Sequence, residues 1–495
     1  MRQKILIVGA GIGGLCTGIR LLHAGYHVTI YEKNAYPGGV LHSISSPDGL
    51  FKWDESASIA INPLTYFEIF QDVDRRPEDY FQWLPLPYYY HVFWSSAKSL
   101  TFSANLSQTQ TALSTLFPKD VEGYTRFVFD TSLKYLKSKN HLLNRSFIKT
   151  KDCFHPRTLY QLLQVAPFTT ASDYIAHYIH SPELRQLLLF QTFFMGSSPY
   201  KLPNTYAAIP AQSQIEGIMH IKGGLSAYTL ALARLFNELG GKIYYKQPID
   251  QVITKHHVVK GVRCGTTFIP SDRVLLNTDF LYAVNHLLPT RHIPSFELSC
   301  STFIIHLGLA KKLKELEVHN LYIHASFKKE IERIFQGKLP ISPSLYLYYP
   351  SALDNSFCQN PTHSILNIMV RVPHLHASSI SWTPYLIDRL YQTCLAILRT
   401  LPGLGDLNQH ILYRSFTTPL TFAKKYHYTA GSCFGIGHTF FQSLVFRPQM
   451  RDPIYANLYY VGSSIHPGNG ASIVMNGAKL LADTIIKEDV AHCSK

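Results

Sequence analysis

Short apolar runs alternate with a longer amphipathic stretch at the beginning of the chain. Residues 4–8 form an almost continuous apolar run, which is typical of a strand buried on both faces of a parallel sheet. The pattern predicts a helix over residues 15–24, ended by Gly25. Residues 27–31 form a second apolar strand that ends at Glu32. This order of strand, helix and strand predicts the first unit of a parallel α/β sheet.

The turn between the first strand and the helix is rich in glycine. Gly9, Gly11 and Gly14 match the pattern G-x-G-x-x-G, and Gly13 lies within it. Glycine permits a tight turn at the first position, backbone approach to a pyrophosphate at the second, and close packing of helix against strand at the third. The free N–H groups at the helix start can bind phosphate, and Glu32 can accept hydrogen bonds from a ribose. We therefore predict a site for an adenine dinucleotide.

A second glycine pair, Gly38 and Gly39, follows the acidic residue closely. Two glycines allow the backbone to pass close to a bulky group, but they are equally suited to a simple turn. These residues alone leave open whether the dinucleotide is FAD or NAD.

The alternation of strands and helices returns twice. A glycine-rich element over 221–225 is followed by a predicted helix over 226–239. Further strands are predicted over residues 242–245, 249–254, 258–264 and 273–279. Near the C-terminus come a strand over 457–462, a glycine-containing loop over 463–470 and a helix over 472–487. The positive end of that last helix can stabilise negative charge, although the segment also fits a surface loop closed by a terminal helix.

Two insertions of different character separate these returns. We predict one dinucleotide-binding domain from residues 1–69, 215–290 and 441–495. Residues 70–214, rich in Leu, Phe and Tyr, and residues 291–440, which mix strands and helices, are predicted to form a second domain that binds the substrate.

Charge narrows the possible partners. Lys and Arg number 46 against 32 Asp and Glu, so the formal net charge is +14, which suits nucleic acid or an acidic membrane surface. Over residues 134–157 cations alternate with apolar side chains, a pattern typical of a lipid-facing surface but also of a solvated helix face. These cations are Lys134, Lys137, Lys139, Arg145, Lys149, Lys151 and Arg157. Nucleic acid is disfavoured because no recognised binding motif accompanies the charge.

The cysteines and the apolar runs point to a cellular location. The eight cysteines are scattered without a Cys-x-x-Cys pair, so we expect reduced thiols and neither a zinc site nor a disulfide framework. No run reaches about 18 apolar residues, and the chain begins without a cleavage site for a signal peptide. We expect a cytoplasmic protein that is peripheral to the membrane and holds no metal.

Motifs along nearly the whole chain resemble those of the carotenoid (phytoene-type) desaturases, and most closely the bacterial diapophytoene (dehydrosqualene) desaturases. They include VGAGIGGL, EKNAYPGG, LRQLLLFQTFFMGSSP, IKGGLSAYTLALARLFNELGGKI, STFIIHLGL, FRPQ and NLYYVGSSIHPGNG. The resemblance implies an α/β fold with an FAD-binding, Rossmann-like domain of the glutathione-reductase and amine-oxidase type. It also implies an inserted mixed α and β domain, peripheral membrane association with membrane-facing helices, and a long apolar tunnel for an isoprenoid polyene.

The resemblance also implies the residues that bind FAD. They are Gly9, Gly11, Gly13, Gly14, Glu32, Lys33, Gly38, Gly39, Ile249, Gly462, Pro467, Gly468, Gly470, Ala471 and Ser472. Three positions depart from the family pattern in segments expected to frame the flavin. Val40 replaces an arginine after the second glycine pair, Asp54-Glu55-Ser56-Ala57 replaces Asp-x-Gly-Pro, and Ser472 replaces a proline.

The implied reaction is desaturation of an acyclic polyene in carotenoid biosynthesis, by hydride transfer from an allylic C–H bond to flavin N5. Such a substrate needs a dry slot that fixes its orientation rather than a catalytic triad or a metal. His466 is the candidate proton acceptor, and a structural role fits it equally. Two alternatives stay open at this point, namely a carotenoid oxygenase acting on a terminal methyl group and a prenyl-lipid carrier without catalytic activity.

Overall fold

The computed structural model describes residues 3–56, 58–139, 143–145, 155–156, 158, 160, 168–289 and 293–493. Its first layer is a five-stranded sheet in which every neighbouring pair runs parallel. In spatial order the strands are β10 (Lys242–Tyr244), β2 (His27–Tyr31), β1 (Lys4–Val8), β14 (Arg273–Leu276) and β20 (Leu458–Tyr460). Segments from the beginning, middle and end of the chain therefore build one sheet.

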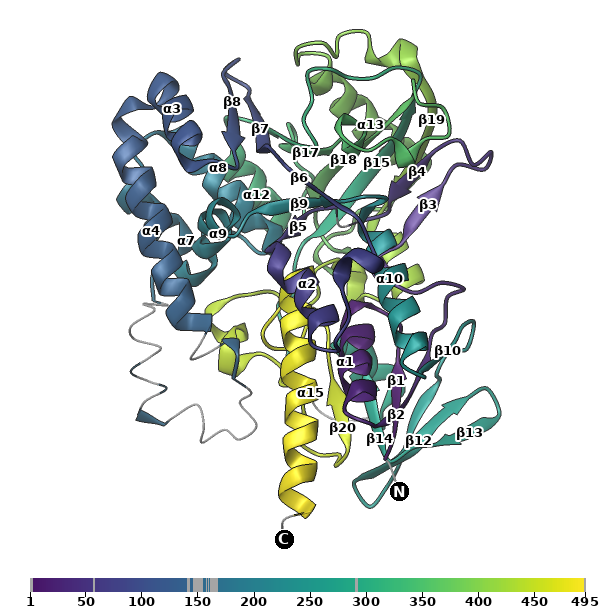
Figure 1. Ribbon diagram of the computed structural model, residues 1–495. Helices are drawn as coiled ribbons and strands as arrows, with labels where there is room; N and C mark the ends of the chain where they lie inside the picture. The colour runs from purple at the N-terminus through teal and green to yellow at the C-terminus, as the bar shows by residue number, and fades with distance from the viewer. Residues whose placement is uncertain are drawn as a thin grey trace.

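Helices from the same three parts of the chain pack together beside this sheet. They are α1 (Ile12–His23), α10 (Gly224–Glu238) and α15 (Ala471–Cys493), and α1 contacts both of the others. Figure 1 shows the three helices next to one another, with α15 running down to the C-terminus. Residues of α1 face a continuous apolar core with the first two strands, which explains the buried run at residues 4–8.

A small antiparallel sheet, β11 (Gln251–Lys255), β12 (Val258–Cys264) and β13 (Thr267–Pro270), adjoins β14. The predicted strand over 249–254 is wrong at its start, because Ile249 lies before β11. Pro248 has no N–H to donate to a strand ladder, so pairing begins after it. The predicted strand over 273–279 likewise ends earlier, at Leu276, and the next residues leave the sheet at its carboxyl edge.

The second layer is a seven-stranded mixed sheet. In spatial order it contains β19 (Ile411–Thr417), β15 (Ser301–Leu309), β18 (Ser364–Val372), β17 (Leu345–Tyr348), β16 (His319–Ile323), β7 (Tyr88–Trp94) and β8 (Ser99–Ser103). All neighbours are antiparallel except β16 and β7. A parallel α/β part joined to a mixed α and β part confirms the predicted fold class.

Helices cover both faces of this second sheet. On one face α13 (Pro384–Leu398) packs against an apolar core formed with β15, β17 and β18. The other face belongs to a separate core shared with a group of helices, seen on the left in Figure 1. They are α3 (Leu106–Leu116), α4 (Val121–Ser138), α7 (Ala171–Tyr178), α8 (Pro182–Thr192), α9 (Ala208–Ile215) and α12 (Phe327–Phe335). Among the described residues, no helix combines the length and the hydropathy needed to cross a bilayer.

Short elements join the two layers. The two-stranded sheet of β3 (Ser43–Ser45) and β4 (Lys52–Asp54) follows β2 of the first layer and precedes β7 of the second. The helix α2 (Pro63–Gln71) comes after it in the chain. A three-stranded sheet combines β5 (Ala60–Ile61), β9 (Ile218–Ile221) and β6 (Trp83–Pro85). Two further short α-helices of the described residues are α11 (Phe280–Tyr282) and α14 (Pro419–Tyr426).

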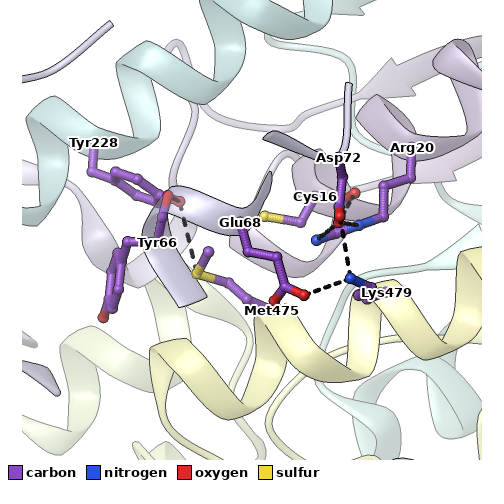
Figure 2. Close-up of polar contacts among 8 residues, drawn as sticks. All are labelled: Cys16, Arg20, Tyr66, Glu68, Asp72, Tyr228, Met475 and Lys479. Carbon is purple, nitrogen blue, oxygen red and sulfur yellow. Dashed lines mark hydrogen bonds and ion pairs between the residues drawn. The ribbon is translucent and has the colours of Figure 1, made fainter. Parts of the chain in front are cut away.

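An ion-pair cluster fixes α2 against the parallel layer. Asp72, just after α2, pairs with Arg20 of α1 at 2.8 Å and with Lys479 of α15 at 3.2 Å. Lys479 also pairs with Glu68 of α2 at 2.5 Å. Figure 2 shows these side chains converging from three helices. The cluster holds α2 in place, and α2 provides part of the wall of the cavity described below.

Candidate functional site

A cavity of about 340 Å³ lies between the two layers. One wall comes from the glycine-rich turns and from the start of α15, and the opposite wall comes from the seven-stranded sheet. A smaller cavity of about 100 Å³ shares several lining residues with it and extends towards α4. The shared residues are Tyr135, Met195, Ile209, Gln212 and Ile473. The volume and the predominantly apolar lining are typical of a site for a small molecule.

The first glycine turn owes its shape to close approaches that exclude side chains. Gly9 has a φ of +99°, and a Cβ atom there would lie 2.6 Å from the Asn277 carbonyl oxygen. A Cβ on Gly14 would lie 2.5 Å from the Gly9 carbonyl oxygen. The Asn277 side chain fastens the turn, since its Oδ1 accepts from the Gly14 N–H at 2.9 Å and its Nδ2 donates to the Val461 carbonyl at 2.9 Å. The turn thus has the tight geometry and close helix packing that the spacing of its glycines requires.

The second glycine pair packs directly against the first turn. The Gly38 N–H donates to the Ala10 carbonyl at 2.8 Å, and Gly38 forms a parallel bridge with Gly11. A Cβ on Gly39 would lie 3.6 Å from the Gly11 Cα atom. Both members of the pair line the cavity, as do Gly11 and Gly13. The backbones of the two glycine turns therefore border the same cavity, and no side chain of these glycines separates them from it.

Glu32 is buried beneath this turn. Its Oε2 accepts from the Ala10 N–H and its Oε1 from the Asn34 N–H, both at 2.8 Å. A carboxylate has about four acceptor positions, so these two bonds leave capacity for a ribose hydroxyl. Burial lowers the pKa of the adjacent Lys33 to about 8. Neither residue lines the cavity, and nor does Ile249, so their contact with a cofactor stays a prediction.

The start of α15 faces the cavity. Gly462, Gly470, Ala471 and Ser472 all line it, so the unsatisfied N–H groups of the first helical turn are directed towards the enclosed space. A helix start of this kind favours negative charge on a bound group.

The loop before α15 contributes less to the cavity than its sequence predicted. Pro467 lines the smaller cavity. Gly468 lies under His438, whose Nε2 would be 2.8 Å from a Cβ at that position. His466 is 1% exposed and lines neither cavity, so a catalytic role for its imidazole stays a prediction.

One buried carboxylate, Asp279, lies at the cavity wall, and a second, Glu55, contacts a residue that lines it. Asp279, directly after the carboxyl end of β14, lines the cavity, and its Oδ1 has no hydrogen-bond partner among the described residues. Its Oδ2 accepts from the Thr429 hydroxyl at 3.2 Å. Burial raises the pKa of Asp279 to about 6. Glu55 instead pairs with Lys425 at 2.5 Å and accepts from the hydroxyl of Tyr426, which lines the cavity.

These features fit the cofactor that the motifs imply. A dinucleotide needs exposed backbone N–H groups for its phosphates and acceptors for its hydroxyl groups. Gly11 and Gly39 line the cavity with backbone that carries no side chain, and the unpaired Oδ1 of Asp279 can accept from a hydroxyl. The residues present therefore fit FAD.

The opposite wall is mostly apolar but carries polar side chains, among them that of Thr302. Ile304, Met369 and Phe194 line it, together with Tyr346 and Arg371. None of these polar residues was identified from the sequence, because each sits within an ordinary apolar strand pattern. Asn277 and Asp279 were also missed, although polar residues directly after a buried parallel strand are a usable signal for a site at the carboxyl edge of a sheet.

Comparisons with known proteins agree with this architecture. Residues 7–75 match the family described as an NAD(P)-binding Rossmann-like domain. The chain is 31% identical to a 4,4'-diapophytoene desaturase (4,4'-diaponeurosporene-forming) of Staphylococcus haemolyticus, covering 99% of this chain and 100% of that protein. It is 30% identical to the protein of the same name in Staphylococcus aureus, over 98% and 99% of the two chains.

Solved structures show a shared fold at low sequence identity. Wild-type putrescine oxidase bound to putrescine superposes with a TM-score of 0.65 and 11% identity, covering 99% of both chains. Cyclohexylamine oxidase from Brevibacterium oxydans gives a TM-score of 0.60 and 14% identity, also over 99% of both chains.

Proposed function

Because the chain belongs to the 4,4'-diapophytoene desaturase family, we propose that it is an FAD-dependent oxidoreductase that desaturates an acyclic, diapophytoene-like isoprenoid in carotenoid biosynthesis. The observation that carries this proposal is one cavity with a bare glycine backbone on one wall and an apolar sheet on the other. The first wall suits a dinucleotide and the second suits a hydrocarbon chain.

The two walls correspond to two roles. Bound FAD would supply a two-electron acceptor for the hydride removed from the substrate. The segments 1–69, 215–290 and 441–495 would bind it, chiefly through Gly11, Gly39 and the start of α15. The segments 70–214 and 291–440 would hold the isoprenoid, excluding water and fixing one C–H bond close to the cofactor.

Turnover of a defined substrate tests this function. Purified protein supplied with FAD, an electron acceptor and diapophytoene in liposomes should yield products with longer conjugation, detected by absorbance at longer wavelength. Mass analysis should show the loss of two hydrogens for each step. Gain of oxygen would instead identify a terminal-methyl oxygenase, and unchanged substrate in the presence of bound flavin would contradict the proposal.

We further propose that α4 holds the protein at the membrane surface where such a substrate resides. Phe129, Leu133 and Leu136 of α4 are about half exposed, at 51%, 59% and 50%. Lys134 and Lys137 lie on the same helix. Exposed apolar side chains beside cations suit an anionic lipid surface. Of the other predicted cations, Lys149, Lys151 and Arg157 lie outside the described residues.

The position of α4 supports this assignment. Lys134 and Tyr135 line the smaller cavity, which adjoins the main one through shared lining residues, so a lipid entering beside α4 would have a short path to the apolar wall. The variant K134Q/K137Q should bind anionic vesicles about 10- to 30-fold more weakly, because each cation contributes about 1 kcal/mol near such a surface. The matched variant K255Q/K260Q removes two exposed charges from the β11–β12 hairpin and should bind normally. Equal losses in both variants would contradict the assignment to α4.

A further inference from the structure

The apolar wall of the cavity contains a guanidinium group that a pure hydrocarbon cannot use. Arg371, near the end of β18, lines the cavity. It donates to the Thr302 hydroxyl at 2.7 Å and lies 4.5 Å above the ring of Phe434. No carboxylate of the described residues pairs with it. An unpaired charge facing an apolar space is costly, and a bound hydrocarbon would remove its remaining water.

A second donor lies next to Arg371. Tyr346 of β17 pairs with Met369 of β18, so it is diagonal to Arg371 across neighbouring strands, and both side chains line the cavity. The Tyr346 hydroxyl is 2.7 Å from Nδ1 of His319, which is buried. Nε2 of His319 has no hydrogen-bond partner among the described residues. Because unpaired buried N–H groups are rarer than unpaired acceptors, the tautomer with the proton on Nδ1 is favoured, and it leaves the tyrosine O–H free to donate into the cavity.

The strand that carries Arg371 also contacts the segment expected to frame the flavin. Asn367, also on β18, donates through its side chain to the Asp54 carbonyl at 2.8 Å. Arg371 is four residues further along the strand, (371 − 367 = 4), which corresponds to about 13 Å at a rise of about 3.3 Å per residue. The backbone of Arg371 therefore lies about 13 Å along β18 from the point at which Asn367 contacts Asp54.

From this geometry we infer that Arg371 and Tyr346 bind an oxygen-bearing end group, with a carboxylate as the best fit, on an isoprenoid chain that occupies the cavity. The planar guanidinium can bind both oxygens of a carboxylate, and the tyrosine hydroxyl supplies another donor. The rest of the chain would lie against Ile304 and Met369. This inference rests on the proposed function and extends its substrate class to isoprenoids that have already been oxidised at one end.

Binding of a matched pair of polyenes tests the inference. The dissociation constants of all-trans-retinoic acid and of its methyl ester are measured by quenching of tryptophan fluorescence in the FAD-loaded protein. The wild-type protein should bind the acid at least about tenfold more tightly than the ester, because a charge-assisted hydrogen bond is lost with the ester. The variant R371M should bind both with similar affinity and keep the flavin absorption spectrum of the wild-type protein.

The control variant is R414M. Arg414 of β19 also lies over aromatic rings, those of Tyr391 and Phe416, but it is outside the cavity and pairs with Asp388. This variant should retain the preference for the acid. Equal affinities in the wild-type protein, or a preference that persists in R371M, would overturn the inference. A changed flavin spectrum or lost flavin in R371M would assign the guanidinium to the cofactor and also overturn it.

The same preparations are assayed with diapophytoene. Hydrocarbon turnover without a preference for the acid leaves the proposed desaturation standing and removes the end-group site. A preference for the acid without turnover of any polyene supports the end-group site and contradicts the proposed desaturation.

Discussion

Replacing Gly14 with alanine would place a methyl group in the tightest contact of the glycine turn. The new Cβ would lie 2.5 Å from the Gly9 carbonyl oxygen, 3.0 Å from Asn277 Oδ1 and 3.1 Å from Ile7 Cγ2. Ordinary contact begins at 3.4 Å, so α1 and β1 must separate by about 0.9 Å (3.4 − 2.5). Backbone atoms and a buried strand residue cannot move aside as a flexible side chain can.

The expected cost of this overpacking is about 1–3 kcal/mol. The displacement also lengthens the bond between the Gly14 N–H and Asn277, which is 2.9 Å, and so disturbs the turn that we propose binds the phosphates. If this free energy destabilises the FAD-bound protein relative to the apoprotein, the affinity for FAD decreases by about 5- to 150-fold. Flavin retained after gel filtration and a titration of the apoprotein with FAD measure this affinity, and denaturant unfolding measures the stability.

The matched control is G405A. Gly405 has no heavy atom within 4 Å of an added Cβ, so this variant should keep its flavin and change stability by less than about 1 kcal/mol. The reasoning is refuted if G14A binds FAD as tightly as the wild-type protein at unchanged stability, or if G405A loses as much as G14A.

Two further predictions concern buried charges. Burial raises the pKa of Asp279 from its ordinary 3.8 to about 6. The free energy of unfolding of the apoprotein should therefore decrease by up to about 3 kcal/mol as the pH rises from 4 to above 6, and that of D279N should not. Parallel stability profiles of the two proteins between pH 4 and 8 would contradict this. D72N should lower the free energy of unfolding by about 2–3 kcal/mol, because it leaves the Arg20 guanidinium, which is 7% exposed, without its partner. K479M, which breaks more exposed pairs, should cost less than about 1 kcal/mol in the same denaturant series, and an equal effect of both variants would argue against the role of burial.

The dinucleotide site was predictable because its signal is local. The short strand, the glycines at fixed spacing and the following helix lie within one stretch of chain, and the covalent backbone alone fixes their relative positions. The predicted return of the sheet at 273–279 and at 457–462 was also correct in kind, since both segments are buried apolar runs. The boundaries were less accurate where a proline or a polar residue ended the pairing, as at Ile249 and Asn277.

The contents of the cavity were not predictable in the same way. Arg371 and Thr302 are far apart in the sequence, and their contact exists only because β15 and β18 pair in one register. A shift of that register by one residue would turn Arg371 to the other face of the sheet, and no local pattern records which register is adopted.

The amino-acid sequence by itself therefore determined that this chain builds a dinucleotide cradle and belongs to a fold with two layers, because both follow from short-range spacing and from apolar periodicity. The tertiary structure alone decided what faces the cradle. It brought Gly38 against Gly11, left Oδ1 of Asp279 without a hydrogen-bond partner among the described residues at the wall, and set Arg371 in an apolar surface. Such placements depend on pairing between distant segments, and their energies are set by burial, which exists only once the chain has folded.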